Sequence, residues 1–282
     1  MCYSLRMNIS TTIANSILIF DSGIGGISIV DEIVQRLPHS TLVYVADNKL
    51  YPYGTQTEEA LVTRALTLFP ALEARYCPAV IVIACNSAST IMLDEVRKIT
   101  HIPVIGVVPA IKPAARHSKS GNIGLLATKG TISRQYTESL ISQFASTLNM
   151  IKIGSDVLVS LAENKSRGLP VDMNILEREL SPLLDAKNVD TVVLGCTHFP
   201  LISQEIHQLL GSHITLIDSG KAVARRTEEV LLTLAETNAS QKNHDAEKAP
   251  HTFAFTACPP NIEQIKPFLR SRGFRQVHTI NI

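Results

Sequence analysis

The chain has 282 residues, of which 45% are hydrophobic, and this length and composition suit about two packed domains. Its 26 basic and 25 acidic residues leave a formal net charge of +1, so no strong electrostatic field favours nucleic acid or a membrane surface. The absence of Trp and the 5% aromatic content argue against a surface on which bases stack. The apolar run at 16–20 is too short for a signal peptide or a membrane span, so we expect neither.

Strand-like and helix-like patterns alternate through the first part of the chain, which is typical of a parallel α/β sheet. We predict strands at 17–20, 41–46, 80–84 and 103–108, and helices at 27–37 and 89–100. A further helix is predicted to begin at Thr55, which forms a capping-box pattern with Glu58. The turn at 21–26 is rich in glycine, but its spacing does not match a dinucleotide-binding fingerprint.

The same alternation then restarts. We predict strands at 122–127, 151–153, 191–195 and 214–217 and helices at 133–145, 157–162 and 173–184. A further helix is predicted to begin at Pro200, and another to end at Ala235. Residues 237–250 are polar and form the best candidate linker, and two late strands, 251–256 and 276–280, flank one more helix.

This order of elements predicts an α/β fold of two pseudo-symmetric lobes, each a short, mainly parallel sheet flanked by helices. We expect the first lobe at 15–110, with 220–282 returning to it because late strands need a sheet to join, and the second lobe at 111–219. Residues 1–14 are expected to be a flexible N-terminal extension. The active site is expected in the cleft between the lobes.

Five cysteines are spread along the chain, an odd number without any C-x-x-C spacing. This distribution argues against a disulfide framework, a zinc knuckle and a thioredoxin-type site. Free thiols are typical of a reducing compartment, so we expect a cytoplasmic protein.

Two of these cysteines occupy matching places, each after a strand-like run and before a helix-like one. Cys85 is followed by Asn86 and Ser87, and Cys196 by Thr197 and His198. Ligands of open α/β sheets bind at the carboxyl ends of strands, and helix N-termini can hold carboxylates and lower a thiol pKa. A buried free cysteine is often only a small apolar residue, but the repeated context favours a pair of thiols that face each other as acid and base.

Seven short motifs follow one another in order along the chain; they are DSG at 21–23, PYG at 52–54, ACNS at 84–87, GVVPA at 106–110, TKGT at 128–131, GCTHFP at 195–200 and DSG at 218–220. With both cysteines, they resemble the glutamate racemases of the aspartate/glutamate racemase superfamily. The resemblance implies cofactor-independent interconversion of L- and D-glutamate for peptidoglycan, by two α/β lobes that close over the substrate. It implies no cofactor, no metal, a small-molecule substrate, a homodimer, and neither a membrane nor direct nucleic-acid binding.

The resemblance also assigns roles to residues. Cys85 and Cys196 are the implied catalytic thiols, with Asp21 assisting Cys85 and His198 assisting Cys196. Cys85 takes the proton from D-glutamate and Cys196 from L-glutamate. The implied substrate-binding residues are Asp21, Ser22, Tyr53, Gly54, Asn86, Ser87, Thr197 and His198. Glu163 aligns with an acidic residue of the family on the His198 side.

Other interpretations stay open at this point. The chain could be an aspartate racemase, which uses the same two-thiol mechanism. It could also be a non-catalytic two-lobe amino-acid-binding protein, a different class of protein with a similar cleft. Asp21 could simply cap the helix after the first strand.

Overall fold

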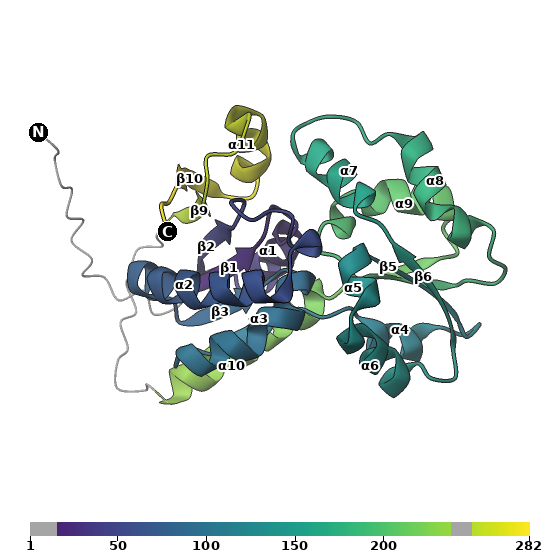
Figure 1. Cartoon of the computed structure of the whole chain (residues 1–282), viewed down its shortest axis with the longest axis horizontal. Helices are drawn as coiled ribbons and strands as arrows, with labels where there is room; N and C mark the ends of the chain where they lie inside the picture. The colour runs from purple at the N-terminus through teal and green to yellow at the C-terminus, as the bar shows by residue number, and fades with distance from the viewer. Residues whose placement is uncertain (1–15, 238–249) are drawn as a thin grey trace, which may run out of the picture.

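A computed structural model describes residues 16–237 and 250–282 of the chain. The expected N-terminal extension, 1–14, lies outside the described residues, as does nearly all of the expected linker. Figure 1 shows two lobes side by side, the first built mainly from the early part of the chain and the second from its middle.

The first lobe contains a six-stranded parallel sheet in the order β10-β9-β2-β1-β3-β4. Its strands are β1 (Ser16–Asp21), β2 (Thr41–Ala46), β3 (Val80–Ile83), β4 (Val104–Gly106), β9 (His251–Phe255) and β10 (Phe274–Thr279). The central strands are buried on both faces, which is why they appear in the sequence as continuous apolar runs. The late strands β9 and β10 therefore extend the sheet that begins with β1.

Helices cover both faces of this sheet because alternate residues of a strand point to opposite sides. Ile17 and Ile19 of β1 pack in one apolar cluster with α1 (Ile27–Arg36), α10 (Gly220–Thr237) and α11 (Ile262–Arg270). Leu18 and Phe20 pack in the other cluster with α2 (Glu58–Tyr76) and α3 (Asn86–Ile99). A short 3-10 helix, η1 (Tyr53–Thr55), lies between β2 and α2.

The second lobe contains a four-stranded parallel sheet in the order β6-β5-β7-β8. Its strands are β5 (Asn122–Ala127), β6 (Asn149–Gly154), β7 (Thr191–Leu194) and β8 (Thr215–Ile217). One face is covered by α7 (Val157–Ser166), α8 (Met173–Leu184), η2 (Phe199–Ile202) and α9 (Ser203–Leu210), and the other by α4 (Ile111–His117) and α6 (Gln135–Phe144). The chain passes between the lobes after β4 and again after β8.

This architecture confirms the predicted fold class, but several local predictions are wrong. The N-cap of α2 is Thr57, whose side chain accepts a hydrogen bond from the backbone N–H of Ala60, whereas Thr55 lies in η1. The expected helix at 133–145 corresponds to α6, which begins at Gln135, but a short helix that was not predicted, α5 (Lys129–Ser133), precedes it; the two are separate because Arg134 between them has extended backbone angles. Pro200 lies in the 3-10 helix η2, and the α-helix begins only at Ser203.

One further difference brings a predicted site residue to a helix end. The helix after Cys85 was expected at 89–100 but begins at Asn86, so Cys85 itself is its N-cap residue. Among the helices of residues 16–237 and 250–282, none combines the length and apolar character needed to cross a membrane.

Candidate active site

A cavity of about 160 Å³ lies where the carboxyl ends of strands from both sheets meet. Its walls are formed by Ser22, Tyr51, Pro52, Tyr53, Gly54, Cys85, Asn86, Ser87, Thr128, Thr131, Asp156, Val159, Ser160, Cys196, Thr197 and His198. Ser22 follows β1, Cys85 follows β3 and Cys196 follows β7, so the parallel strands of both lobes bring their following residues to one place. The cavity is thus located in the cleft where the fold predicts a ligand site.

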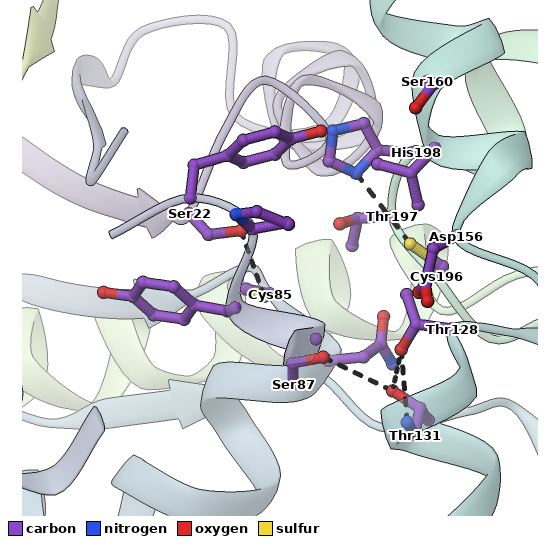
Figure 2. A pocket seen from close by; sticks show the side chains of 16 residues that line it. Ser22, Cys85, Ser87, Thr128, Thr131, Asp156, Ser160, Cys196, Thr197 and His198 are labelled. Atoms are coloured by element: carbon purple, nitrogen blue, oxygen red, sulfur yellow. Dashed lines mark hydrogen bonds between the residues drawn. The ribbon is translucent and has the colours of Figure 1, made fainter. Parts of the chain in front are cut away.

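The two thiols face this cavity from different lobes (Figure 2). Each cysteine is 7% exposed. The sulfur of Cys85 accepts a hydrogen bond from the backbone N–H of Ala88 in the first turn of α3, and it lies 3.8 Å from Ser22 Oγ. Burial and then the charge of Asp21 nevertheless raise the pKa of Cys85 to about 12. The expected lowering of this thiol pKa by the helix N-terminus is therefore outweighed.

Asp21 lies behind Ser22, fully buried at the end of β1, and does not line the cavity itself. Its Oδ1 accepts hydrogen bonds from Gly23 N at 2.8 Å and from Ser22 Oγ at 3.4 Å. Its Oδ2 accepts one at 3.1 Å from Thr197 Oγ1, which belongs to the other lobe. Burial raises the pKa of Asp21, while the charge of His198 and the hydrogen bonds from Gly23 and Thr197 oppose that rise.

The alternative of a simple helix cap for Asp21 is wrong. The N-cap residue of α1 is Gly26, and the helix has no side-chain cap. Asp21 instead closes the turn at Gly23 and connects the two lobes through Thr197.

On the Cys196 side, the structure forms a continuous chain of titratable groups. His198 Nδ1 lies 3.8 Å from Cys196 Sγ, and His198 Nε2 lies 3.1 Å from Glu163 Oε1. The second Glu163 oxygen accepts a hydrogen bond at 2.8 Å from Arg167. Glu163 reaches this place from α7, and the backbone N–H of Ile24 in the first lobe also donates to it.

These contacts set opposite pKa shifts on the two partners. Burial lowers the pKa of His198, but the hydrogen bonds to Cys196 and Glu163 outweigh it, so its pKa lies well above the usual value. Burial raises the pKa of Glu163, but the hydrogen bond and charge of His198 and the charge of Arg167 outweigh it, so its pKa is lowered. The pair is therefore an imidazolium and a carboxylate, and the cation faces the sulfur of Cys196.

The structure brings together all but one of the predicted binding residues on the cavity wall; these are Ser22, Tyr53, Gly54, Asn86, Ser87, Thr197 and His198. Asp21 is the exception, since it lies one layer deeper. Among the described residues, Asn86 Nδ2 is buried and has no hydrogen-bond partner, so it is a free donor at the N-terminus of α3. The hydroxyl of Tyr53 is turned away from the cavity, since it donates to Asp47 Oδ2 at 2.6 Å.

Several lining residues were not assigned a role from the sequence. Thr128 caps α5 directly after β5, and its Oγ1 donates to Thr131 Oγ1 at 2.9 Å on the same wall as Ser87 (Figure 2). The pattern of a strand followed by a polar helix start, which identified the cysteines, could have identified Thr128 as well. Tyr51 and Ser160 carry no comparable signal, since one lies in a loop and the other within α7.

Comparison with known proteins gives a consistent result. The family model of the Asp/Glu/Hydantoin racemases matches residues 21–227. Glutamate racemase of Escherichia coli O139:H28 is 44% identical over 269 residues, which cover 95% of this chain and 92% of that protein.

Solved structures extend the comparison to three dimensions. A crystal structure of Escherichia coli glutamate racemase in complex with L-glutamate and the activator UDP-MurNAc-Ala matches with a TM-score of 0.87 and 41% identity, over 95% of this chain and 98% of that one. The Francisella tularensis enzyme in complex with D-glutamate matches with a TM-score of 0.74 and 26% identity, over 96% of this chain and 98% of that one.

Proposed function

The chain belongs to the Asp/Glu/Hydantoin racemase family, and on that premise we propose how it interconverts L-glutamate and D-glutamate. Cys85 and Cys196 act as the two bases, without a cofactor, and the D-glutamate formed supplies peptidoglycan synthesis. The observation that supports this mechanism is the placement of two thiols from two lobes on one cavity, each with its own titratable neighbour.

Racemisation requires that the α-proton leaves one face of the substrate and that another proton reaches the opposite face. A thiolate on one side and a thiol on the other meet this requirement, and the two exchange roles in the reverse direction. With L-glutamate, Cys196 takes the α-proton and Cys85 donates its own. With D-glutamate, Cys85 takes the proton and Cys196 donates. Each positioned acid or base contributes about 10²–10⁴-fold to the rate.

The two thiols are assisted differently. On one side, the His198 imidazolium stabilises the thiolate of Cys196, and Glu163 holds the ring in place. On the other side, Asp21 reaches Cys85 only through Ser22, whose hydroxyl contacts both groups. We propose that Asp21 receives the Cys85 proton by way of Ser22, which the raised pKa of the Asp21 carboxyl favours.

Neutral donors hold the two carboxylates of the substrate. The free Asn86 amide and the Ser87 hydroxyl lie at the N-terminus of α3, where backbone N–H groups attract anions. Ser22 and Thr197 line the cavity from the two lobes, but their hydroxyl hydrogens are directed to Asp21. Tyr53 contributes its ring and backbone rather than its hydroxyl, which is bound to Asp47.

The related proteins support glutamate over aspartate, because the relatives with the highest identity reported above are named glutamate racemases. Incubation of the purified protein with L-glutamate or L-aspartate in D₂O, without added cofactor, tests this choice. We expect loss of optical rotation and deuterium at Cα with glutamate alone. Racemisation of aspartate at a comparable rate would contradict the assignment.

We further propose that two lobes close over the substrate. One lobe is formed by residues 15–110 with 220–282, and the other by residues 111–219. The protein acts as a homodimer in the cytoplasm on a small-molecule substrate, and it binds neither membrane nor nucleic acid. Size-exclusion chromatography with light scattering tests the dimer, and a monomer of 30.8 kDa would contradict it.

A further inference from the structure

The loop 47–54, which follows β2 and runs into η1, is joined by hydrogen bonds to the C-terminal part of the chain. Asn48 Nδ2 donates to the carbonyl of Ala257 at 2.8 Å, and the backbone N–H of Ala257 donates back to Asn48 Oδ1 at 2.9 Å. The backbone N–H of Lys49 donates to Thr256 Oγ1 at 3.2 Å. The other end of the same loop carries four residues of the cavity wall, 51–54. The C-terminal segment 250–282 contributes no residue to that wall.

Asp47 is the centre of this connection. Its Oδ2 accepts hydrogen bonds from Tyr53 Oη at 2.6 Å and from Arg64 Nε at 3.0 Å. Its Oδ1 accepts hydrogen bonds from Arg64 Nη2 at 2.6 Å and from Thr256 Oγ1 at 2.6 Å. Arg64 also donates to the backbone oxygen of Ile282 at 3.2 Å. Neither the fully buried Asp47 nor its partners Arg64 and Thr256 touch the cavity.

The charge state of this cluster is fixed by its hydrogen bonds. Burial alone raises the pKa of Asp47, but the hydrogen bonds from Arg64, Thr256 and Tyr53 outweigh it, so Asp47 is a carboxylate. Burial, followed by the charge of Asp47, raises the pKa of Tyr53, so this side chain remains a phenol and a donor. A buried carboxylate that loses one donor is left under-satisfied, and it draws more strongly on the donors that remain.

We propose that Arg64 and Thr256 are positioning residues for substrate binding, which fix Tyr53 and the cavity wall at 51–54 through the buried carboxylate of Asp47. The C-terminal segment thereby sets the substrate affinity of a cavity that it does not line. The inference rests on the proposed function, because the affinity in question is that for glutamate. It predicts that changes at Thr256 alter substrate binding and leave the two thiols in place.

The test compares three substitutions in one strand and the turn after it. Thr256→Val keeps the shape of the side chain but removes the hydroxyl, and Thr256→Ser keeps the hydroxyl. Thr252→Val is the matched control, since the hydroxyl of Thr252 contacts only Gln276 at the surface. For Thr256→Val we expect a KM about tenfold higher in both directions, with kcat changed by less than about threefold, because the loop loses the hydrogen bond to the buried charge of Asp47 and the one from Lys49 N–H. Thr256→Ser and Thr252→Val should retain the wild-type KM.

A double-mutant cycle then tests whether the effect runs through Tyr53. Tyr53→Phe removes the phenol hydroxyl, and the combination with Thr256→Val should raise KM no further than the larger single effect. Additive effects on KM, or a Thr256→Val variant that loses kcat or thermal stability with an unchanged KM, would overturn the proposal. If Thr256→Val fails to fold, the same cycle with Arg64→Lys decides. Failure of the wild-type protein to racemise glutamate would instead overturn the proposed function.

Discussion

Cys85 and Cys196 occupy equivalent places in the two lobes, but their electrostatic surroundings differ. Cys85 has a raised pKa because it is buried and faces the carboxyl of Asp21. Cys196 faces an imidazolium that Glu163 holds in the charged form. At neutral pH Cys85 therefore rests as a thiol, which is the form that the proposed mechanism needs for donation of a proton to the substrate.

The proposed two-base mechanism requires both thiols. We expect Cys85→Ser and Cys196→Ser each to lower kcat below detection, by about 10³-fold or more, because an alcohol is a far weaker base and acid catalyst than a thiol. The circular dichroism signal of L- or D-glutamate follows the reaction in each direction. The matched control is Cys258→Ser, since Cys258 is exposed and lies outside the cavity. Near wild-type turnover in either active-site variant would exclude the two-base mechanism.

Because Asp21 and His198 differ in charge, we predict different isotope effects in the two directions of the reaction. Asp21→Asn should change the primary deuterium isotope effect on proton removal from D-glutamate more than from L-glutamate, since Asp21 serves Cys85. His198→Asn should do the reverse, since His198 contacts Cys196. The equilibrium constant cannot change, so the difference appears in the isotope effects measured in each direction and not in the ratio of the two kcat/KM values. Equal changes in both directions for both variants would contradict the assignment of Asp21 to Cys85 and of His198 to Cys196.

The charge pair between His198 and Glu163 predicts a change in pH dependence. Because Glu163 is one of the groups that raise the pKa of His198, Glu163→Gln should lower that pKa. The imidazolium is then lost at lower pH, so the basic limb of the kcat/KM profile should move to lower pH. The pH profile of Glu205→Gln is the control, because Glu205 pairs with Lys165 and does not contact His198. An unchanged basic limb in Glu163→Gln would contradict this assignment.

At the level of elements, helix starts decide where the site residues lie. The helix α3 begins at Asn86, directly after Cys85, so the thiol and the free Asn86 amide share the N-terminal end of one helix. The break at Arg134 ends α5 after a single short turn, and Thr131 of that turn stays on the cavity wall next to Thr128. Small shifts in a helix boundary thus determine which donors face the substrate.

The helix α2 offers a direct test of a corrected boundary. Thr57→Ala should lower the free energy of unfolding by about 1 kcal/mol, because it removes the N-cap hydrogen bond to Ala60. The matched substitution Thr55→Ala should cost less, since Thr55 bonds only the carbonyl of Pro52 at the surface. Urea denaturation of the two variants measures the difference. An equal or larger loss of unfolding free energy in Thr55→Ala would instead support the capping-box prediction.

The sequence predicted the strands well because each is a continuous apolar run that is buried on both faces, as at 41–46 and 122–127. The two cysteines and their neighbours were predicted because they follow such runs directly. The clusters around Asp47 and Glu163 were harder to predict. Their partners, Thr256 for Asp47 and His198 for Glu163, are distant in the sequence and meet only after the sheets have formed. No local pattern marks such a pair.

At the scale of the whole molecule, the two lobes meet through polar contacts that involve Asp21 and Glu163, two of the buried carboxyl groups beside the cavity. Thr197 of the second lobe donates to Asp21 of the first, and its carbonyl accepts from Ser28 Oγ at 2.8 Å. The backbone N–H of Ile24 in the first lobe donates to Glu163 of the second. Relative movement of the lobes therefore changes the surroundings of both proton-transfer partners at once.

Gly25 of the first lobe lies directly against His198 and Thr197 of the second, which allows a specific prediction. A Cβ at this position would lie 2.3 Å from His198 Nδ1 and 2.8 Å from Thr197 Oγ1, so Gly25→Ala must displace the imidazole or separate the lobes. Displacement of the imidazole disrupts the contact between His198 and Cys196, and separation of the lobes breaks the hydrogen bond from Thr197 to Asp21. A displacement of about 1 Å at a group that takes part in the reaction can cost about 10²-fold in rate. We expect kcat to fall by about that factor while the melting temperature falls little, because the clash lies between the lobes rather than within either core. Racemisation assays with thermal melts measure both quantities. A variant with full activity would show that the lobes do not need this close contact at His198 for catalysis.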